Sequence, residues 1–219
     1  MASDSPPGII TAETLPATGA PYTLSVPAQQ ETGDAPPLVV SLHYGGPAPP
    51  YYGRGLLEGV VEPALRELGA IMVAPDCPGP AWAEGECARN VLRLIDHVQS
   101  EHNIDASRIL LTGYSKGGIG TWALAAGHQD RFTAAIVMAG QPPVDWDPAG
   151  WNLPLYVIHA AEDEILPIEP VTIAVQSLRD AGKAVEYEIV EGITHFETHR
   201  FAPLLRQSLP WLREAWAGN

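Results

Sequence analysis

The segment from Arg108 to Gly127 constrains the fold of this chain more than any other. A short apolar run, residues 108–112, leads into Gly113-Tyr114-Ser115-Lys116-Gly117, and helical composition follows from residue 115 to 126. Glycines two positions before and two after Ser115 leave room for a sharp reversal that strains the serine backbone. The reversal lifts the hydroxyl above a sheet edge, beside the positive end of the following helix. This strand–turn–helix pattern predicts that Ser115 is a nucleophile.

The rest of the chain alternates apolar runs with amphipathic segments. Nearly continuous apolar runs, typical of strands buried on both faces, occur at 38–43, 70–75, 134–138 and 155–159. Alternating strand patterns occur at 22–26 and 185–190, and helical spacing occurs at 58–68, 84–102, 169–181 and 201–216. Alternating strands and helices with short connections predict an α/β fold with a mostly parallel sheet and helices on both faces.

The chain is expected to form one domain. It has 219 residues, enough for one substantial core, and no long linker divides it. Residues 1–21 are polar and rich in Pro and Thr, and we interpret them as an extended lead-in to a catalytic domain at 22–219. The connection from Ala139 to about Pro154 is too short to form a large lid.

A serine hydroxyl needs a base to act as a nucleophile near neutral pH, and the base is usually histidine. In folds with this strand–turn–helix nucleophile the chain order is Ser, then Asp or Glu, then His. His195 follows directly after the last strand, whereas His199 falls near the start of the last helix, where a surface position is expected. The sequence therefore favours His195 as the base.

The acid that orients this base should follow the strand at 155–159. Three consecutive carboxylates stand there, so spacing alone leaves the choice open among Glu162, Asp163 and Glu164. Asp163 is favoured, because Pro167 shortly after it turns the chain towards the next helix. Its role would be to accept a hydrogen bond from the imidazole and fix the tautomer. His159 ends the buried strand and is interpreted as a structural residue.

Backbone N–H groups should stabilise the oxyanion that forms during acyl transfer. One donor is expected from Lys116, the residue after the nucleophile. The second should come from the loop after an early strand, His43-Tyr44-Gly45-Gly46, where either Tyr44 or Gly45 is a candidate. Trp82, Trp146 and Trp151 lie in loops at the carboxyl edge of the predicted sheet, so each is expected either to line an open aromatic cleft or to pack its loop onto the body of the domain.

Composition limits the partners and cofactors. A net charge of −14 repels the phosphate backbone of nucleic acid and disfavours anionic membranes. The first ten residues lack the basic region and apolar core of a secretory signal, and no run approaches a membrane span. Cys77 and Cys87 show no metal-ligand spacing, while their separation would permit a local disulfide or leave two thiols. We expect no metal and no organic cofactor.

These residues together resemble the α/β-hydrolase superfamily, and within it small carboxylesterases related to feruloyl esterases, polyhydroxybutyrate depolymerases and the predicted-peptidase group. The resemblance runs from Pro21 to the last helix and is strongest over 105–122, DASRILLTGYSKGGIGTW. It implies Ser115 as nucleophile, Asp163 as acid and His195 as base. Two positions depart from the family pattern: Tyr44 replaces the first glycine after His43, and Ala160 stands where glycine is usual.

The function expected from these residues is hydrolysis of short-chain or aryl carboxylic esters through an acyl-enzyme. A thioesterase, acyltransferase or peptidase would use the same three side chains, because the acyl-transfer step is shared. A non-catalytic binding protein on the same fold is a further alternative, although Ser115, Asp163 and His195 are all present. The expected partner is a small ester.

Overall fold

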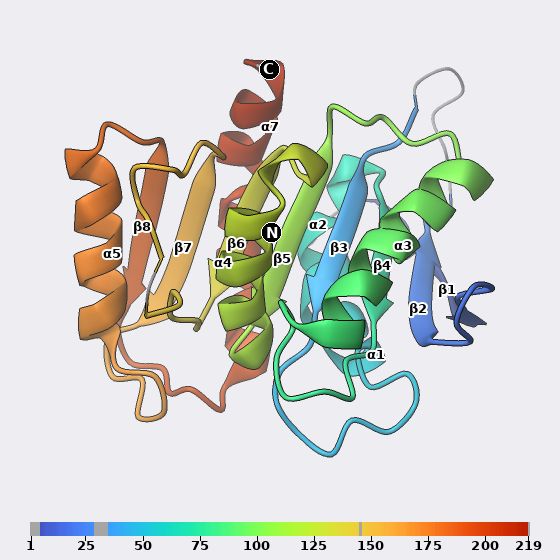
Figure 1. The fold of residues 1–219 in the computed structure, drawn as a ribbon, viewed down its shortest axis with the longest axis horizontal. Coiled ribbons are helices and arrows are strands. Elements are labelled where there is room, and N and C mark those ends of the chain that lie inside the picture. The colour runs from blue at the N-terminus through green and yellow to red at the C-terminus, as the bar shows by residue number, and fades with distance from the viewer. Residues whose placement is uncertain (1–4, 29–34, 145, 219) are drawn as a thin grey trace.

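A twisted sheet of eight strands forms the centre of the protein (Figure 1). The computed structural model describes residues 5–28, 35–144 and 146–218. The strand order is β1-β2-β4-β3-β5-β6-β7-β8. The strands are β1 (Ile9–Thr14), β2 (Pro21–Val26), β3 (Leu38–Leu42), β4 (Ile71–Pro75), β5 (Ile109–Tyr114), β6 (Ala134–Met138), β7 (Leu155–Ala160) and β8 (Val185–Val190). β2 is antiparallel to β1 and β4, and the other neighbouring strands are parallel.

Helices cover both faces of the sheet, and each face has its own hydrophobic core. α3 (Gly85–Glu101), α4 (Lys116–Gly127) and α5 (Ile168–Asp180) lie in front of the sheet in Figure 1. The opposite face is covered by α1 (Arg54–Leu56), η1 (Leu57–Val61), α2 (Glu62–Leu65), η2 (Arg66–Leu68), α6 (Phe201–Gln207) and α7 (Leu209–Ala217). Short helical turns η3 (Gln129–Arg131) and η4 (Thr198–Arg200) complete the elements. This arrangement confirms the predicted α/β fold.

The central strands form where apolar residues are continuous, because helices bury both faces of a parallel sheet. All residues of β3, β4 and β6 are buried. In β8, at the edge, Glu186 and Ile189 are exposed and the other residues are partly buried, so burial does not follow the alternation of the sequence. The parallel strands β3, β5, β7 and β8 end at one edge of the sheet, where the loops that carry the predicted site residues begin.

The structure differs from the sequence expectations at both ends of the chain. The lead-in contains β1, whose Ile9 to Thr14 pair antiparallel with Val26 to Pro21, so it extends the sheet of the predicted domain. β1 is mostly exposed, which explains why no apolar pattern marks it. The single helix expected at 201–216 is divided at Ser208, because Pro210 lacks the N–H that would continue α6.

The helix expected at 58–68 begins earlier, at Arg54, and continues through η1, α2 and η2 to Leu68. The connection between β6 and β7, residues 139–154, contains no helix or strand among its described residues. None of the helices in the described ranges has the length and apolar character needed to cross a bilayer.

Candidate active site

Ser115 lies at the sharp turn between β5 and α4, with backbone angles φ 55° and ψ −118°. Its N–H donates to the Met138 carbonyl at 3.0 Å, which ties the turn to β6. A Cβ atom at Gly113 would lie 2.3 Å from the Gly117 carbonyl oxygen, and one at Gly117 would lie 1.9 Å from the Leu42 carbonyl oxygen. Both positions therefore require glycine, and the chain reverses at Ser115 with a strained backbone.

The structure brings the three predicted side chains together. His195 Nε2 lies 2.8 Å from Ser115 Oγ, and His195 Nδ1 lies 2.7 Å from Asp163 Oδ2. Asp163 is an acceptor in its ionised form, so Nδ1 carries the hydrogen and Nε2 is free to accept the serine proton. Asp163 Oδ1 accepts hydrogen bonds from the N–H groups of Ile165 and Leu166, at 3.0 and 2.7 Å. Both carboxylate oxygens of Asp163 therefore have donors.

The β8–η4 loop, residues 191–197, carries His195. All three consecutive carboxylates of the β7–α5 loop accept hydrogen bonds from it. Glu162 accepts a hydrogen bond from the Gly192 N–H at 3.0 Å, and Glu164 accepts one from the His195 N–H at 2.9 Å. The Tyr114 hydroxyl donates to the His195 carbonyl oxygen at 2.5 Å. Sequence reasoning missed Glu164 and Tyr114 as partners of this loop, although each is adjacent to a predicted site residue.

His159 lies beneath this group, at the end of β7, and is fully buried. Its Nε2 donates to the Leu166 carbonyl at 2.8 Å and lies 3.7 Å from Asp163 Oδ2. Burial lowers the pKa of His159, against smaller raising effects of the Leu166 hydrogen bond and the Asp163 charge. A neutral, buried His159 therefore supports the Asp163 loop, as its predicted structural role requires. His199 is exposed in η4, at the surface position predicted for it.

On the other side of Ser115, the β3–α1 loop, residues 43–53, contains the second candidate oxyanion donor. His43 Nδ1 donates to the Tyr44 carbonyl at 2.7 Å, and the Tyr52 hydroxyl donates to the Gly45 carbonyl at 3.2 Å. His43 Nε2 accepts from the Cys77 N–H at 3.0 Å, which fixes the neutral tautomer with hydrogen on Nδ1. Burial lowers the pKa of His43. Lys116, the other predicted donor, is the first residue of α4.

The predicted tryptophan-lined cleft is wrong for Trp82 and Trp151. Each is only 1% exposed, so neither presents a surface to a substrate. Trp82 packs against His43, with ring centroids 4.7 Å apart, and donates to its carbonyl. Trp151 and the partly buried Trp146 stack edge-to-face on the buried Trp122 of α4. The β6–β7 connection therefore uses Trp146 and Trp151 to attach itself to the core.

Exposed apolar side chains stand instead beside the acid and the base. Phe196 is 73% exposed and its ring centroid lies 5.7 Å from that of His195, while Ile165 is 50% exposed two residues after Asp163. Apolar and aromatic side chains next to a few placed polar groups are typical of the lining of ligand sites. No periodic pattern marks these residues, because they lie in irregular loops. Within the described ranges, no three His, Cys, Asp or Glu side chains are grouped to hold a metal ion.

The chain is similar to known esterases. Over 163 residues the chain is 29% identical to a probable feruloyl esterase C from Aspergillus terreus, covering 69% of this chain and 57% of that protein. It is 29% identical over 126 residues to acetylxylan esterase A from Emericella nidulans, covering 52% of this chain and 40% of that protein. The matched part thus spans 57% of the first and 40% of the second of these curated relatives.

The fold has close counterparts among solved structures. The structure of a thermostable esterase matches with a TM-score of 0.78 and 27% identity, over 94% of this chain and 62% of that one. A model of the phospholipase/carboxylesterase family matches residues 85–210, which is more than half of the chain and includes Ser115, Asp163 and His195. By fold, by the order of its site residues and by this match, the chain belongs to the phospholipase/carboxylesterase family of the α/β-hydrolases.

Proposed function

We propose that this protein is a serine carboxylesterase that hydrolyses short-chain or aryl carboxylic esters through an acyl-enzyme. The observation that carries the proposal is the continuous hydrogen-bonded series from Asp163 through His195 to Ser115, at 2.7 and 2.8 Å. Each residue has the hydrogen-bonding group that its role needs. The Asp163 carboxylate accepts the hydrogen that His195 carries on Nδ1, and the Ser115 hydroxyl lies beside the free Nε2. The catalytic domain in this proposal includes β1, because that strand pairs with β2.

In the acylation half-reaction, Ser115 Oγ attacks the ester carbonyl carbon while His195 Nε2 takes the hydroxyl proton. Asp163 accepts the hydrogen bond from Nδ1 and stabilises the imidazolium that forms. The tetrahedral intermediate then collapses, His195 gives its proton to the leaving alcohol oxygen, and the acyl group remains on Ser115. Water then attacks the acyl carbonyl carbon while the same imidazole takes its proton. The bond from the acyl group to Ser115 Oγ breaks, His195 returns the proton to Oγ, and the acid is released.

The oxyanion donors in this proposal are the N–H groups of Lys116 and Gly45. Because the Tyr44 carbonyl accepts from His43, the trans peptide that follows points the Gly45 N–H in the opposite direction. A Cβ atom at Gly45 would lie 3.9 Å from the Lys116 Cβ, so the two residues are neighbours. These observations favour Gly45 over Tyr44.

An ester with a small acyl or aryl group suits the surroundings of Ser115. The 16-residue connection after β6 provides no lid, and Phe196 and Ile165 offer exposed apolar surface beside His195 and Asp163. Aromatic and aliphatic side chains of this kind recognise apolar groups by contact area and ring stacking. The feruloyl and acetylxylan esterase names of the relatives support ester substrates of this size.

The test is hydrolysis of p-nitrophenyl acetate by the wild type and by Ser115→Ala. Loss of the nucleophile should reduce kcat by about 10⁵- to 10⁶-fold, to the background rate of the assay. Equal rates for the two proteins would refute the assignment and favour the non-catalytic alternative. A panel of acetyl, butyryl, octanoyl and feruloyl esters, with matched thioesters and amides, then ranks substrates by kcat/KM.

A further inference from the structure

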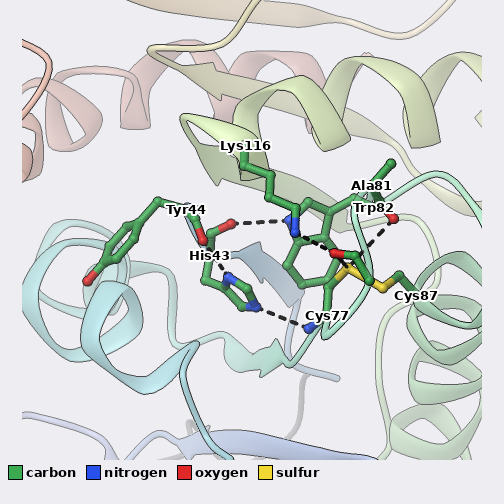
Figure 2. The surroundings of a disulfide bond; sticks show 8 residues. His43, Tyr44, Cys77, Ala81, Trp82, Cys87 and Lys116 are labelled. Atoms are coloured by element: carbon green, nitrogen blue, oxygen red, sulfur yellow. Dashed lines mark hydrogen bonds between the residues drawn. A yellow bond between two sulfur atoms is a disulfide. The ribbon is translucent and has the colours of Figure 1, made fainter. Parts of the chain in front are cut away.

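The loop closed by the Cys77–Cys87 disulfide contacts both residues that flank the proposed oxyanion hole. The two sulfur atoms join the end of β4 to the first turn of α3, across ten residues (Figure 2). Cys77 and Cys87 are both buried. Figure 2 shows His43, Tyr44 and Lys116 beside this loop. The disulfide loop, residues 77–87, therefore contacts two chain segments that are distant in sequence.

On the β3–α1 side, two donors of the disulfide loop hold His43. The Cys77 N–H donates to His43 Nε2 at 3.0 Å, and the Trp82 indole N–H donates to the His43 carbonyl at 3.1 Å. His43 in turn donates to the Tyr44 carbonyl at 2.7 Å, which orients the peptide between Tyr44 and Gly45. Through these hydrogen bonds the disulfide loop influences the direction in which the Gly45 N–H points.

On the α4 side, an acceptor of the same loop holds the Lys116 side chain. Lys116 Nζ donates to the Gly79 carbonyl at 2.6 Å, and the side chain is partly buried. Lys116 is the residue whose backbone N–H starts α4 directly after Ser115. Gly120, one turn later, packs against Trp82 so closely that a Cβ atom there would lie 2.4 Å from the Trp82 Cβ. The disulfide loop therefore packs against the first turns of α4.

We infer that the disulfide loop is a positioning element of the oxyanion hole, which sets the Gly45 and Lys116 N–H groups relative to Ser115. This inference rests on the proposed function. The disulfide fixes Cys77, and with it the donor to His43, to the buried Cys87 in the first turn of α3. The contacts do not involve His195 or Asp163, so the loop acts on oxyanion stabilisation and leaves the proton relay unchanged. Such donors act chiefly in the transition state, so their displacement lowers kcat more than it changes KM.

The first experiment compares the wild type with the double variant Cys77→Ala/Cys87→Ala on p-nitrophenyl acetate. Active sites are counted by the burst of p-nitrophenol, so that kcat refers to folded, acylated enzyme. We expect kcat per active site to fall about 10-fold or more while KM changes less than about twofold, since loss of one whole oxyanion donor costs about 10²- to 10³-fold. The pH at which kcat/KM reaches half its maximum should not move.

A second set of variants tests the same inference without removing the disulfide. Lys116→Met keeps the backbone N–H and most of the aliphatic chain but loses the donor to Gly79, and we expect kcat to fall about threefold to tenfold. Lys116→Arg retains a donor and should recover most of the loss. Lys183→Met is the matched control, because Lys183 is partly buried like Lys116 and its Nζ donates to Asn152 Oδ1, and its kcat should equal that of the wild type.

Two results would overturn the inference. One is a lower unfolding temperature of the double cysteine variant with wild-type kcat per active site, which is the outcome of a purely stabilising disulfide. The other is wild-type kcat for Lys116→Met, which decides the question if the cysteine variant does not fold. Ser115→Ala is assayed in parallel: hydrolysis that does not depend on Ser115 refutes the proposed function, whereas Ser115-dependent hydrolysis with unchanged kcat in both variants refutes only the inference.

Discussion

Two loops lie beside Ser115 and are held by different means. We call the β8–η4 loop, residues 191–197, the His195 wall, and the β3–α1 loop, residues 43–53, the β3–α1 wall. The β8–η4 loop, with His195, is held by three consecutive side chains of one neighbouring loop, Glu162, Asp163 and Glu164. The β3–α1 loop is held by the segment that follows β4: Asp76 accepts from the Tyr51 and Gly53 N–H groups, and the disulfide loop holds His43. One wall thus depends on three adjacent carboxylates, and the other on one carboxylate together with a loop that a disulfide closes.

Both loops are held from the next strand of the sheet. β7 and β8 are adjacent and parallel, so the loops that leave their carboxyl ends meet directly and a single acidic run bridges them. β3 and β4 are adjacent and parallel in the same way, so the segment after β4 meets the β3–α1 loop. The difference is that the Cys77–Cys87 disulfide closes the segment after β4, whereas the β7–α5 loop is held by hydrogen bonds. The following predictions test this contrast from the largest expected effect to the smallest.

Replacing Asp163 by Asn should remove most of the activity, because it disrupts the hydrogen bonding that orients His195. Both oxygens of Asp163 accept hydrogen bonds, so the amide NH₂ of Asn must face either the backbone donors of the loop or His195 Nδ1. In the second case the imidazole takes the wrong tautomer, with its hydrogen directed at Ser115. We expect kcat to fall about 10³- to 10⁴-fold, measured on p-nitrophenyl acetate. Near-full activity of this variant, with a loss in Glu162→Gln, would show that Glu162 is the acid.

Both walls contain a buried neutral histidine, so mild acid should weaken the fold. Burial is the main cause that lowers the pKa of His43 and of His159. A base whose pKa is lower in the folded state takes up a proton on unfolding, so its contribution is complete above the unfolded value near pH 6.5 and is lost as pH falls below it. The free energy of unfolding should therefore decrease by up to about 1.4 kcal/mol per pH unit for each histidine.

Urea unfolding between pH 5.0 and 7.5 measures this slope. Burial raises the pKa of Asp76, next to His43, so that carboxyl group acts in the opposite direction and the variants must isolate each imidazole. His159→Gln should remove the contribution of the His195 wall, and His43→Gln that of the β3–α1 wall. A slope that both variants leave unchanged would contradict the prediction.

Tyr114→Phe should weaken the attachment of the His195 wall while leaving its hydrogen bonds to the three carboxylates in place. The variant keeps the ring contact with Phe201 and loses only the hydroxyl that donates to the His195 carbonyl. We expect the free energy of unfolding to fall by about 1 kcal/mol, within the range for one buried hydrogen bond, and kcat to fall a few-fold. Chemical unfolding and steady-state kinetics check the two values. Wild-type kcat would show that the carboxylates alone position His195.

The smallest effect is expected for Glu164→Gln. Glu164 is exposed, and a neutral amide oxygen can still accept the hydrogen bond from the His195 N–H. We therefore expect kcat to change less than about twofold, because exposed charges contribute little. Glu164→Ala, which removes the acceptor, is the comparison and should lower kcat more. If Gln and Ala have equal effects, the hydrogen bond to His195 contributes nothing measurable.

The sheet and the turn at Ser115 follow from local patterns in the sequence, whereas spacing alone left the acid open among Glu162, Asp163 and Glu164. Continuous apolar runs such as Leu38–Leu42 and Ala134–Met138 identify strands buried on both faces, and the glycines around Ser115 identify its turn. The polar edge strand Ile9–Thr14 has no such pattern, since it pairs through its backbone while its side chains face water.

The surroundings of Ser115 could not be predicted in the same way, because they depend on contacts between distant segments. Trp82 appeared to be a cleft residue because of its loop, but the absence of a side chain at Gly120 lets it pack inside. The cysteine spacing allowed a disulfide or free thiols, and only the approach of β4 to α3 joins Cys77 to Cys87. The partners of His195 and His43 likewise come from neighbouring strands.

The positive φ of Ser115 also lowers the stability of the fold at the residue that the proposed reaction needs. A non-glycine residue in this region of backbone space costs of the order of 1–3 kcal/mol, a noticeable share of the 5–15 kcal/mol that typically separates a folded domain from its unfolded chain. Glycine adopts these angles without the steric cost, so Ser115→Gly should be inactive yet unfold at a higher urea concentration than Ser115→Ala. Selection for hydrolysis would then maintain a less stable residue at the centre of the fold, and a search for stability alone would remove the nucleophile first.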